Sequence, residues 1–371
     1  MPKGVSVVPR TTDDGWLPDA RAITRADLFS ERAGPLEAGV LAILSTTAVE
    51  TLNFELWSVV EERAARFERG APSCAELEFR MHWGRSVLYE ANGRPEDALE
   101  AARVVSRSAA SVASNLLGRC RRASVLLRYG ERLAYRDLAM SIRRQFETLD
   151  VSTMRDRATA MLPLEVAEML ALMGDPQGAT NALRAAQTMT NPPPSADSEI
   201  RARLALHAYA EGVVADAAGS SLRAQRSYRL AFEAYRCIGF TRRAMNVALR
   251  LAEMTGEEAF ASFVDEHARA LSPQSWIRAR LAATSVLQRD PALKRLSRAE
   301  REVLAYLVDG RSTADIASAR NRSPQTTRNT ISKLLSTFGV ASRSALLREV
   351  GRRHLLDADG APTWGASVRA L

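Results

Sequence analysis

Three polar residues near the C-terminus have the spacing and the chemistry needed to read the edges of nucleic-acid bases. Arg328, Asn329 and Ser332 share the outward face of a helix predicted to begin at Pro324. A guanidinium matches the O6 and N7 acceptors of guanine, and a carboxamide matches N6 and N7 of adenine. The alternative is that all three are solvated side chains on an ordinary exposed helix face.

A second group of side chains, close to two predicted helix starts, has the chemistry of phosphate anchors. Hydroxyls, amides and cations at such positions bind backbone oxygens, and the helix dipole there favours anions. The candidates are Ser312, Thr313, Arg320, Arg322, Gln325, Thr326 and Lys333. A surface role without any ligand is the alternative for each of them.

Clear helix signals position both groups. Ser297 and Glu300 have the spacing of a capping box, and Gly310 follows as a helix-ending residue. Ser312 is placed to cap a second helix, and Ser323-Pro324 combines an N-cap hydroxyl with a proline at the first helical position. The pattern predicts four short helices, of which the second and third form a helix-turn-helix.

The positive charge of the chain is concentrated in the same segment. Between Lys294 and Arg353 there are 13 basic and five acidic residues, so this segment alone carries the +8 of the whole chain. A basic helical unit of this kind is typical of proteins that bind phosphate backbones. The frequent use of arginine throughout the chain explains the residue type, but it does not explain the local excess over acids.

The segment from Leu296 to Arg343 resembles the LuxR/GerE-type helix-turn-helix of bacterial transcription regulators. Four family motifs occur in order and without gaps: the opening motif at Leu296, Ser297, Ala299, Glu300, Glu302, Val303 and Leu304; the second at Gly310, Ser312, Asp315, Ile316 and Ala317; the third at Ser323, Thr326, Thr327, Arg328 and Thr330; the last at Thr337, Phe338, Gly339, Val340, Ser342 and Arg343. The resemblance implies double-stranded DNA as a partner. It also implies that Arg328, Asn329 and Ser332 face base edges in the major groove.

Four positions depart from the family pattern. Arg320 and Arg322 stand where aliphatic residues are usual, Thr327 replaces a valine, and Thr330 replaces a frequent histidine. Arg320 has a stem long enough to pass the edge of the core and carry its guanidinium to a phosphate. The other interpretation is a looser domain, and the departures bear more on base specificity than on the fold.

The remaining four-fifths of the chain contain an internal repeat marked by glycines. Helical stretches precede Gly93, Gly130, Gly174, Gly219 and Gly256, and an alanine that begins another helix follows each within five residues. A period near 40 residues with paired helices predicts an α-solenoid. The segments around residues 89–109 and 172–187 resemble tetratricopeptide repeats, with Ala98 and Ala179 where two helices approach closely.

These patterns together predict an all-α protein, in which a tetratricopeptide-like solenoid precedes a small four-helix LuxR-type domain. We expect an irregular N-terminal tail over residues 1–34, the repeat domain over 35–290, the DNA-binding domain over 291–356 and a loose tail over 357–371. The 371-residue length suits two or more hydrophobic cores, and a composition with 46% hydrophobic residues suits a globular protein.

Several classes of protein do not fit the sequence. There is no apolar run long enough to span a membrane and no secretory leader, so we expect a cytoplasmic protein. The three cysteines and four histidines are isolated from one another, so we expect no metal site, no cofactor and no catalytic group. The P-loop of ATP-dependent regulators is also missing.

The sequence leaves the oligomeric state open. Over residues 344–355, Ala345, Leu346, Val350 and Leu355 form one stripe, which either pairs two copies of the domain or packs only on its own domain. In the resembled family, the corresponding helix often pairs two domains on inverted half-sites.

The expected function is therefore a sequence-specific transcriptional regulator that is not an enzyme. Its solenoid would bind a protein, a peptide or a small effector. The alternative is an interaction scaffold whose terminal helical unit binds DNA nonspecifically or not at all.

Overall fold

The computed structural model describes residues 35–70, 75–107, 111–150, 157–188, 197–353, 355–356 and 362. The predicted tail at residues 1–34, the proline-rich loop at 191–195 and most of the predicted tail at 357–371 lie outside the described residues. The described part is helical and contains no strand, only one isolated bridge between Leu356 and Pro362. The all-α prediction is confirmed.

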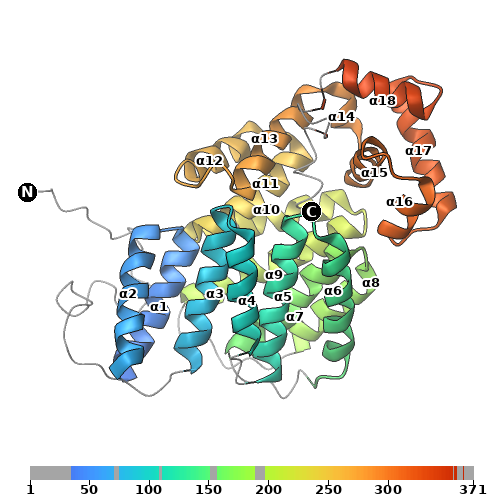
Figure 1. Ribbon diagram of the computed structural model, residues 1–371. Helices are drawn as coiled ribbons and strands as arrows, with labels where there is room; N and C mark the ends of the chain where they lie inside the picture. The colour runs from blue at the N-terminus through green and yellow to red at the C-terminus, as the bar shows by residue number, and fades with distance from the viewer. Residues whose placement is uncertain are drawn as a thin grey trace, which may run out of the picture.

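The first twelve helices pair in sequence order and stand side by side, as Figure 1 shows for α1 to α8. They are α1 (Pro35–Thr51), α2 (Phe54–Gly70), α3 (Ala75–Ala91), α4 (Pro95–Arg107), α5 (Val112–Arg128), α6 (Arg132–Glu147), α7 (Arg157–Met173), α8 (Pro176–Thr188), α9 (Asp197–Ala217), α10 (Ser221–Cys237), α11 (Thr241–Thr255) and α12 (Glu258–Ala268). This is the predicted tetratricopeptide-like arrangement.

The repeat glycines end the first helix of each pair, as the sequence predicts. All five marker glycines have a positive φ, between +72° and +87°, a conformation that costs glycine little. At Gly93 the backbone of Gln274 also lies 2.6 Å from the position that a Cβ would occupy. Ala98 and Ala179 are fully buried, so each repeat packs closely on its neighbour.

The repeats curve far enough for the first and last pairs to meet. The Arg242 guanidinium of α11 donates to both carboxylate oxygens of Glu50 in α1, at 2.9 and 3.1 Å, and the Arg243 Nε atom donates to the same group at 2.9 Å. These partners are about 190 residues apart in sequence, so this contact depends on the curvature of the whole solenoid.

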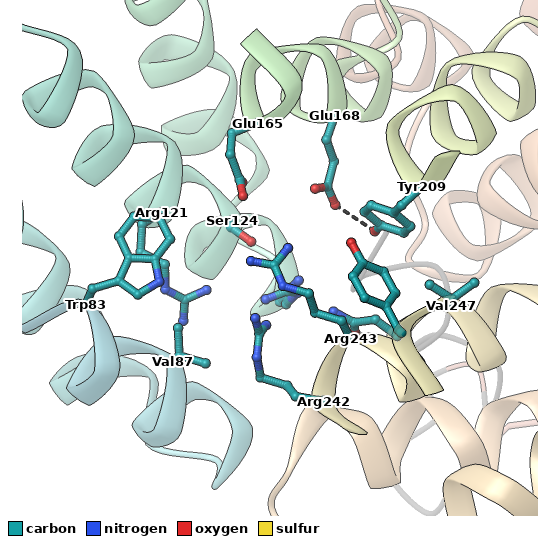
Figure 2. A pocket seen from close by; sticks show the side chains of 13 residues that line it. Trp83, Val87, Arg121, Ser124, Glu165, Glu168, Tyr209, Arg242, Arg243 and Val247 are labelled. Carbon is teal, nitrogen blue, oxygen red and sulfur yellow. Dashed lines mark hydrogen bonds between the residues drawn. The ribbon is translucent and has the colours of Figure 1, made fainter. Parts of the chain in front are cut away.

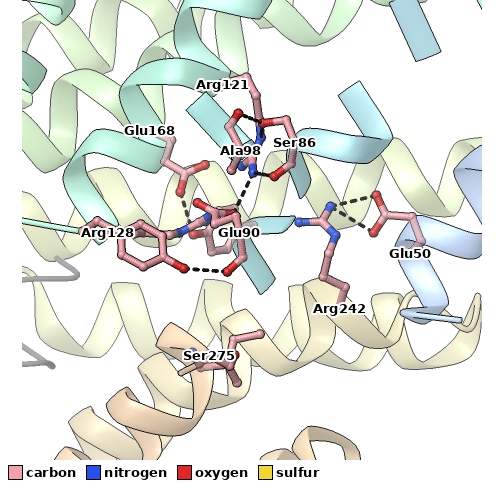
Figure 3. A network of polar contacts seen from close by, with 12 residues as sticks. Glu50, Ser86, Glu90, Ala98, Arg121, Arg128, Glu168, Arg242 and Ser275 are labelled. Atoms are coloured by element: carbon pink, nitrogen blue, oxygen red, sulfur yellow. Dashed lines mark hydrogen bonds and ion pairs between the residues drawn. The ribbon is translucent and has the colours of Figure 1, made fainter. Parts of the chain in front are cut away.

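A buried polar network lies inside this curve. Glu90 of α3 accepts from Arg121 and Arg128 of α5 at 2.8 and 2.6 Å, and Arg121 also donates to Ser86 (Figure 3). The Glu90 side chain is 2% exposed and that of Arg121 is 5% exposed. Burial alone raises the pKa of Glu90, but the two arginines outweigh it and hold the pKa below its usual value.

Six further helices follow the repeats. They are α13 (Trp276–Arg289), α14 (Pro291–Arg295), α15 (Arg298–Val308), α16 (Thr313–Ala319), α17 (Pro324–Phe338) and α18 (Arg343–Arg352). In Figure 1, α13 leads from the repeats to a small unit of helices α14 to α18. This unit has its own hydrophobic core, built around Leu293, Leu304, Ile316, Leu334 and Leu346. No helix in the described ranges is long and apolar enough to cross a membrane.

Candidate nucleic-acid interface

The helix caps that the sequence indicates orient the C-terminal helices. Ser297 and Glu300 form the capping box at the start of α15, and Ser312 and Asp315 form a second one at the start of α16. At the start of α17 the Ser323 hydroxyl accepts from the Thr326 amide at 3.1 Å. Each cap satisfies backbone N–H groups that the helix leaves unpaired, so the three helix starts are firmly defined.

The turn between α16 and α17 adopts a conformation that is unusual for a residue with a side chain. Asn321 has a φ of +51°, in the left-handed region that asparagine tolerates better than most residues. On the inner side of α17, Thr327 is fully buried and its hydroxyl donates to the Ser323 carbonyl at 3.3 Å. The threonine found here in place of valine is therefore accommodated without an unpaired hydroxyl.

The three candidate base-reading residues lie together on the exposed side of α17. Arg328, Asn329 and Ser332 are all exposed. The Gln325 side chain donates to the Asn329 carboxamide oxygen at 3.1 Å and so leaves the donor group of Asn329 available. In Figure 1, α17 lies at the outer edge of the molecule, away from the repeats. The arrangement leaves these side chains open to a ligand.

The candidate phosphate contacts fall into two groups in the structure. Five of them line the starts of α16 and α17 without an ion pair to the described residues: Ser312, Thr313, Arg322, Gln325 and Thr326. All of these are exposed except Thr313, which is half-buried. Lys333 and Arg320 form the second group, because each has an acidic partner.

The two ion pairs tie helices of the unit together. The Lys333 ammonium lies 2.6 Å from Glu300, which caps α15, while 69% of the lysine side chain is still exposed. The Arg320 Nε atom donates to Glu302 at 3.2 Å, and its side chain is only 10% exposed. Lys333 thus remains at the surface, whereas Arg320 links α15 to the end of α16. A phosphate contact by Arg320 stays a prediction that requires its pair to open.

The stripe on the last helix packs within its own domain. Leu346 and Val350 are fully buried and Leu355 is 4% exposed, all three in the core of the small unit. Ala345 is half-buried. The stripe therefore packs on its own domain, and these residues give no support to a dimer through α18.

Sequence reasoning missed two arginines that join the small unit to the repeats. Arg132 of α6 forms an ion pair with Glu302, donates to the Tyr306 hydroxyl at 2.9 Å, and lies over the Tyr306 ring. Arg136, one turn further along α6, donates to the Ser318 carbonyl at 3.0 Å and to Asn321 at 3.1 Å. No local pattern marks these residues, because their partners are more than 160 positions away.

We expect the contacts of Arg132 and Arg136 to keep the small unit docked on α6. In the double variant Arg132→Ala, Arg136→Ala, the ion pair, the cation–π contact and the two hydrogen bonds from Arg136 are all lost. Small-angle X-ray scattering should then give a larger radius of gyration and a broader distance distribution. Arg144→Ala, on an exposed position of the same helix, is the control and should leave the curve unchanged. An unchanged curve for the double variant would show that other contacts hold the unit.

Comparison with known proteins agrees with this geometry for the C-terminal part of the chain. Residues 294–350 match the family described as bacterial regulatory proteins, luxR family (GerE). No curated protein matches the chain in sequence. Among solved structures, a Rap protein complexed with competence and sporulation factor is 10% identical, with 90% of this chain and 95% of that chain covered, at a TM-score of 0.38. At this TM-score the two chains share only a general likeness of helical architecture. Residues 294–350 are thus identified, by motif, capping geometry and family match, as a helix-turn-helix domain of the luxR family of bacterial regulatory proteins.

Proposed function

We propose that this chain is a sequence-specific DNA-binding regulator of transcription whose helical-repeat region receives the input. The observation that carries the proposal is the luxR-family domain, in which Arg328, Asn329 and Ser332 form an exposed group on α17. Five candidate phosphate contacts lie at the starts of α16 and α17, and one of them, Gln325, donates a hydrogen bond to Asn329. An arginine and an asparagine side by side on such a helix suit direct reading of a major groove.

The proposal divides the chain between residues 290 and 291, with the repeat domain over 35–290 and the DNA-binding domain over 291–356. Two separate hydrophobic cores support this division, since one ends at Ile277 and the other begins at Ala292. Asp290 caps α14 by accepting from the amides of Ala292 and Leu293. The flanking tails over 1–34 and 357–371 remain predictions.

A selection from a pool of random duplexes tests the proposal directly. With the full-length protein, we expect one sequence motif to be enriched and its binding to exceed nonspecific binding by at least about 10³-fold. The second candidate is a scaffold whose terminal unit does not read DNA sequence. Two contacts favour it: Arg320 pairs with Glu302, and Asn321 in the turn of the helix-turn-helix accepts a hydrogen bond from Arg136. A pool that yields no motif, with binding explained by charge alone, would support the scaffold.

The distribution of charge gives a further prediction about nonspecific binding. Before Lys294 the chain holds 37 basic and 36 acidic residues, so the repeats should neutralise few phosphates. A fragment that starts at Asp290 should therefore bind nonspecific DNA with nearly the full-length dependence of log K on log salt, about 0.9 per phosphate neutralised. Titrations of one duplex at several salt concentrations measure both slopes. A fragment slope lower by about two or more would mean that the repeats themselves contact DNA.

A further inference from the structure

A polar pocket lies at the centre of the curved repeats, where helices α3, α5, α7, α9, α10 and α11 face one another (Figure 2). The space inside it is about 50 Å³, within about 520 Å³ that includes open solvent at its mouth. A carboxylate therefore fits inside, and the rest of a larger ligand must extend into the opening. Four arginines and two glutamates line it, together with a few aromatic and aliphatic side chains.

Glu50, on the far side of Arg242 and Arg243 from the pocket, binds both guanidiniums and leaves some of their N–H groups free for a ligand. One terminal nitrogen of Arg242 donates to Glu50, and the buried Nε atom of Arg242 has no hydrogen-bond partner within the described residues. Arg243 uses its Nε atom on Glu50, and Figure 2 shows its guanidinium extending from α11 toward the middle of the pocket. Because Glu50 is 5% exposed, it orients both guanidiniums without occupying the cavity.

An unpaired hydroxyl faces the same space. Tyr235 of α10 lines the pocket and is 1% exposed. Its hydroxyl lies within reach of the Arg243 guanidinium, but it makes no well-aligned hydrogen bond within the described residues. Buried hydroxyls in folded proteins nearly always have a partner, so an orphan in a cavity wall indicates a place for a ligand or a water. Arg243 lies beside this ring, with its guanidinium carbon 5.9 Å from the ring centre.

The two glutamates come from one helix, α7, on the opposite wall. Glu168 accepts from the Tyr209 hydroxyl at 2.8 Å, whereas Glu165 makes no hydrogen bond or ion pair to the described residues and interacts with Arg243 and Arg242 only at longer range. Burial, and then the neighbouring Glu168, raises the pKa of Glu165 above its usual value. In its ionised form Glu165 is attracted to Arg243 and Arg242, so it competes with an anionic ligand for these two guanidiniums.

We propose that this pocket binds an organic ligand whose carboxylate is held by the free N–H groups of Arg242 and Arg243 and by the Tyr235 hydroxyl. The apolar body of the ligand then packs on Trp83, Val87 and Val247, which line the same cavity. Glu90 and Glu50, behind the lining, pair with the four arginines, so an anion is not favoured by net charge. It is favoured over a cation by the N–H groups that Arg242 and Arg243 do not use on Glu50. The carboxylate belongs either to a free organic acid or to the C-terminus of a short peptide. That this ligand is the input of the regulator rests on the proposed function, but the binding chemistry of the pocket does not.

Calorimetric titration of the full-length protein without DNA tests this proposal. Because no DNA is present, an absence of ligand binding would not bear on the proposed DNA-binding function. The probes are N-acetyl-L-phenylalanine and its neutral amide, and the tripeptide Ala-Ala-Phe and its C-terminal amide. We expect one or both free carboxylates to bind, each at least about tenfold more tightly than its amide, because a charge-assisted hydrogen bond is lost with the charge. Binding of the acid alone indicates a free organic acid as ligand, and binding of the peptide alone indicates a peptide terminus.

Two variants with opposite expected effects make the test specific. Arg243→Gln should weaken binding of the carboxylate probe at least about tenfold. Glu165→Gln keeps the shape of the wall and removes a carboxylate that competes with the ligand, so it should tighten binding. A merely structural role would not produce this gain, and the measurement stands even if Arg243→Gln fails to fold. Arg236→Gln, at a side chain 52% exposed on α10, is the control and should bind as the parent does.

The proposal is overturned if the amides bind as well as the acids, if none of the four probes binds at millimolar concentration, or if Arg243→Gln folds and binds as the parent does. Weaker binding by Glu165→Gln would also contradict it, because that glutamate would then hold a cationic group of the ligand.

Discussion

Replacing Arg328 by alanine should weaken specific DNA binding by about 1–3 kcal/mol and relax the preference at one base pair of the selected site. Arg328 is exposed on α17, and its guanidinium makes no hydrogen bond or ion pair to the described residues. A bidentate pair with a guanine would be lost entirely in the alanine variant, whereas neighbouring contacts would remain. The effect should therefore be local to one position of the DNA site.

Competition between the selected duplex and single-base variants of it measures this effect. Arg348→Ala is the matched control, because it removes the same charge from an exposed position on α18, outside the candidate reading face. That control should lower binding to all duplexes about equally, if at all, and keep the preference. If Arg328→Ala folds normally and discriminates between the duplexes as the parent does, the proposed base contact is wrong.

The largest effect on stability is expected for Glu90→Gln, at about 3–5 kcal/mol of unfolding free energy. The substitution keeps the size of the side chain but leaves the guanidinium of Arg121, 5% exposed, and that of Arg128, 13% exposed, without their shared anion. An uncompensated buried charge costs far more than the removal of a surface pair. Urea unfolding followed by circular dichroism measures the loss.

Glu100→Gln is the control for this experiment. Glu100 lies on the neighbouring helix α4 and pairs with Arg103, but 56% of its side chain is exposed, so its loss should leave the urea midpoint unchanged. The contribution of Glu90 to the free energy of unfolding should also decrease as the pH is lowered. Since its folded pKa lies below the usual value, the stabilisation is complete above the unfolded pKa and disappears as the pH falls through the folded one. Equal losses in both variants would contradict this role for the buried network.

Local patterns of residues were enough to predict the helices, their caps and the two faces of α17. Ser297, Ser312 and Ser323 each cap the predicted helix, because a cap closes hydrogen bonds within three residues of itself. The repeat glycines mark the turns of the solenoid for the same local reason. Helical periodicity alone separates buried Thr327 from exposed Arg328 and so indicates the candidate reading face.

Which charges are free, and where distant helices meet, depends on the packing of the folded chain. Composition shows a basic C-terminal segment, but only the packing of α15 against α16 and α17 pairs Arg320 with Glu302 and Lys333 with Glu300. Arg132 and Arg136 at the docking contact, and the arginines around the central pocket, bring together groups as far as 193 residues apart. Such contacts depend on the small rotation between successive repeats, summed over the whole solenoid, and no local pattern in the sequence encodes that sum.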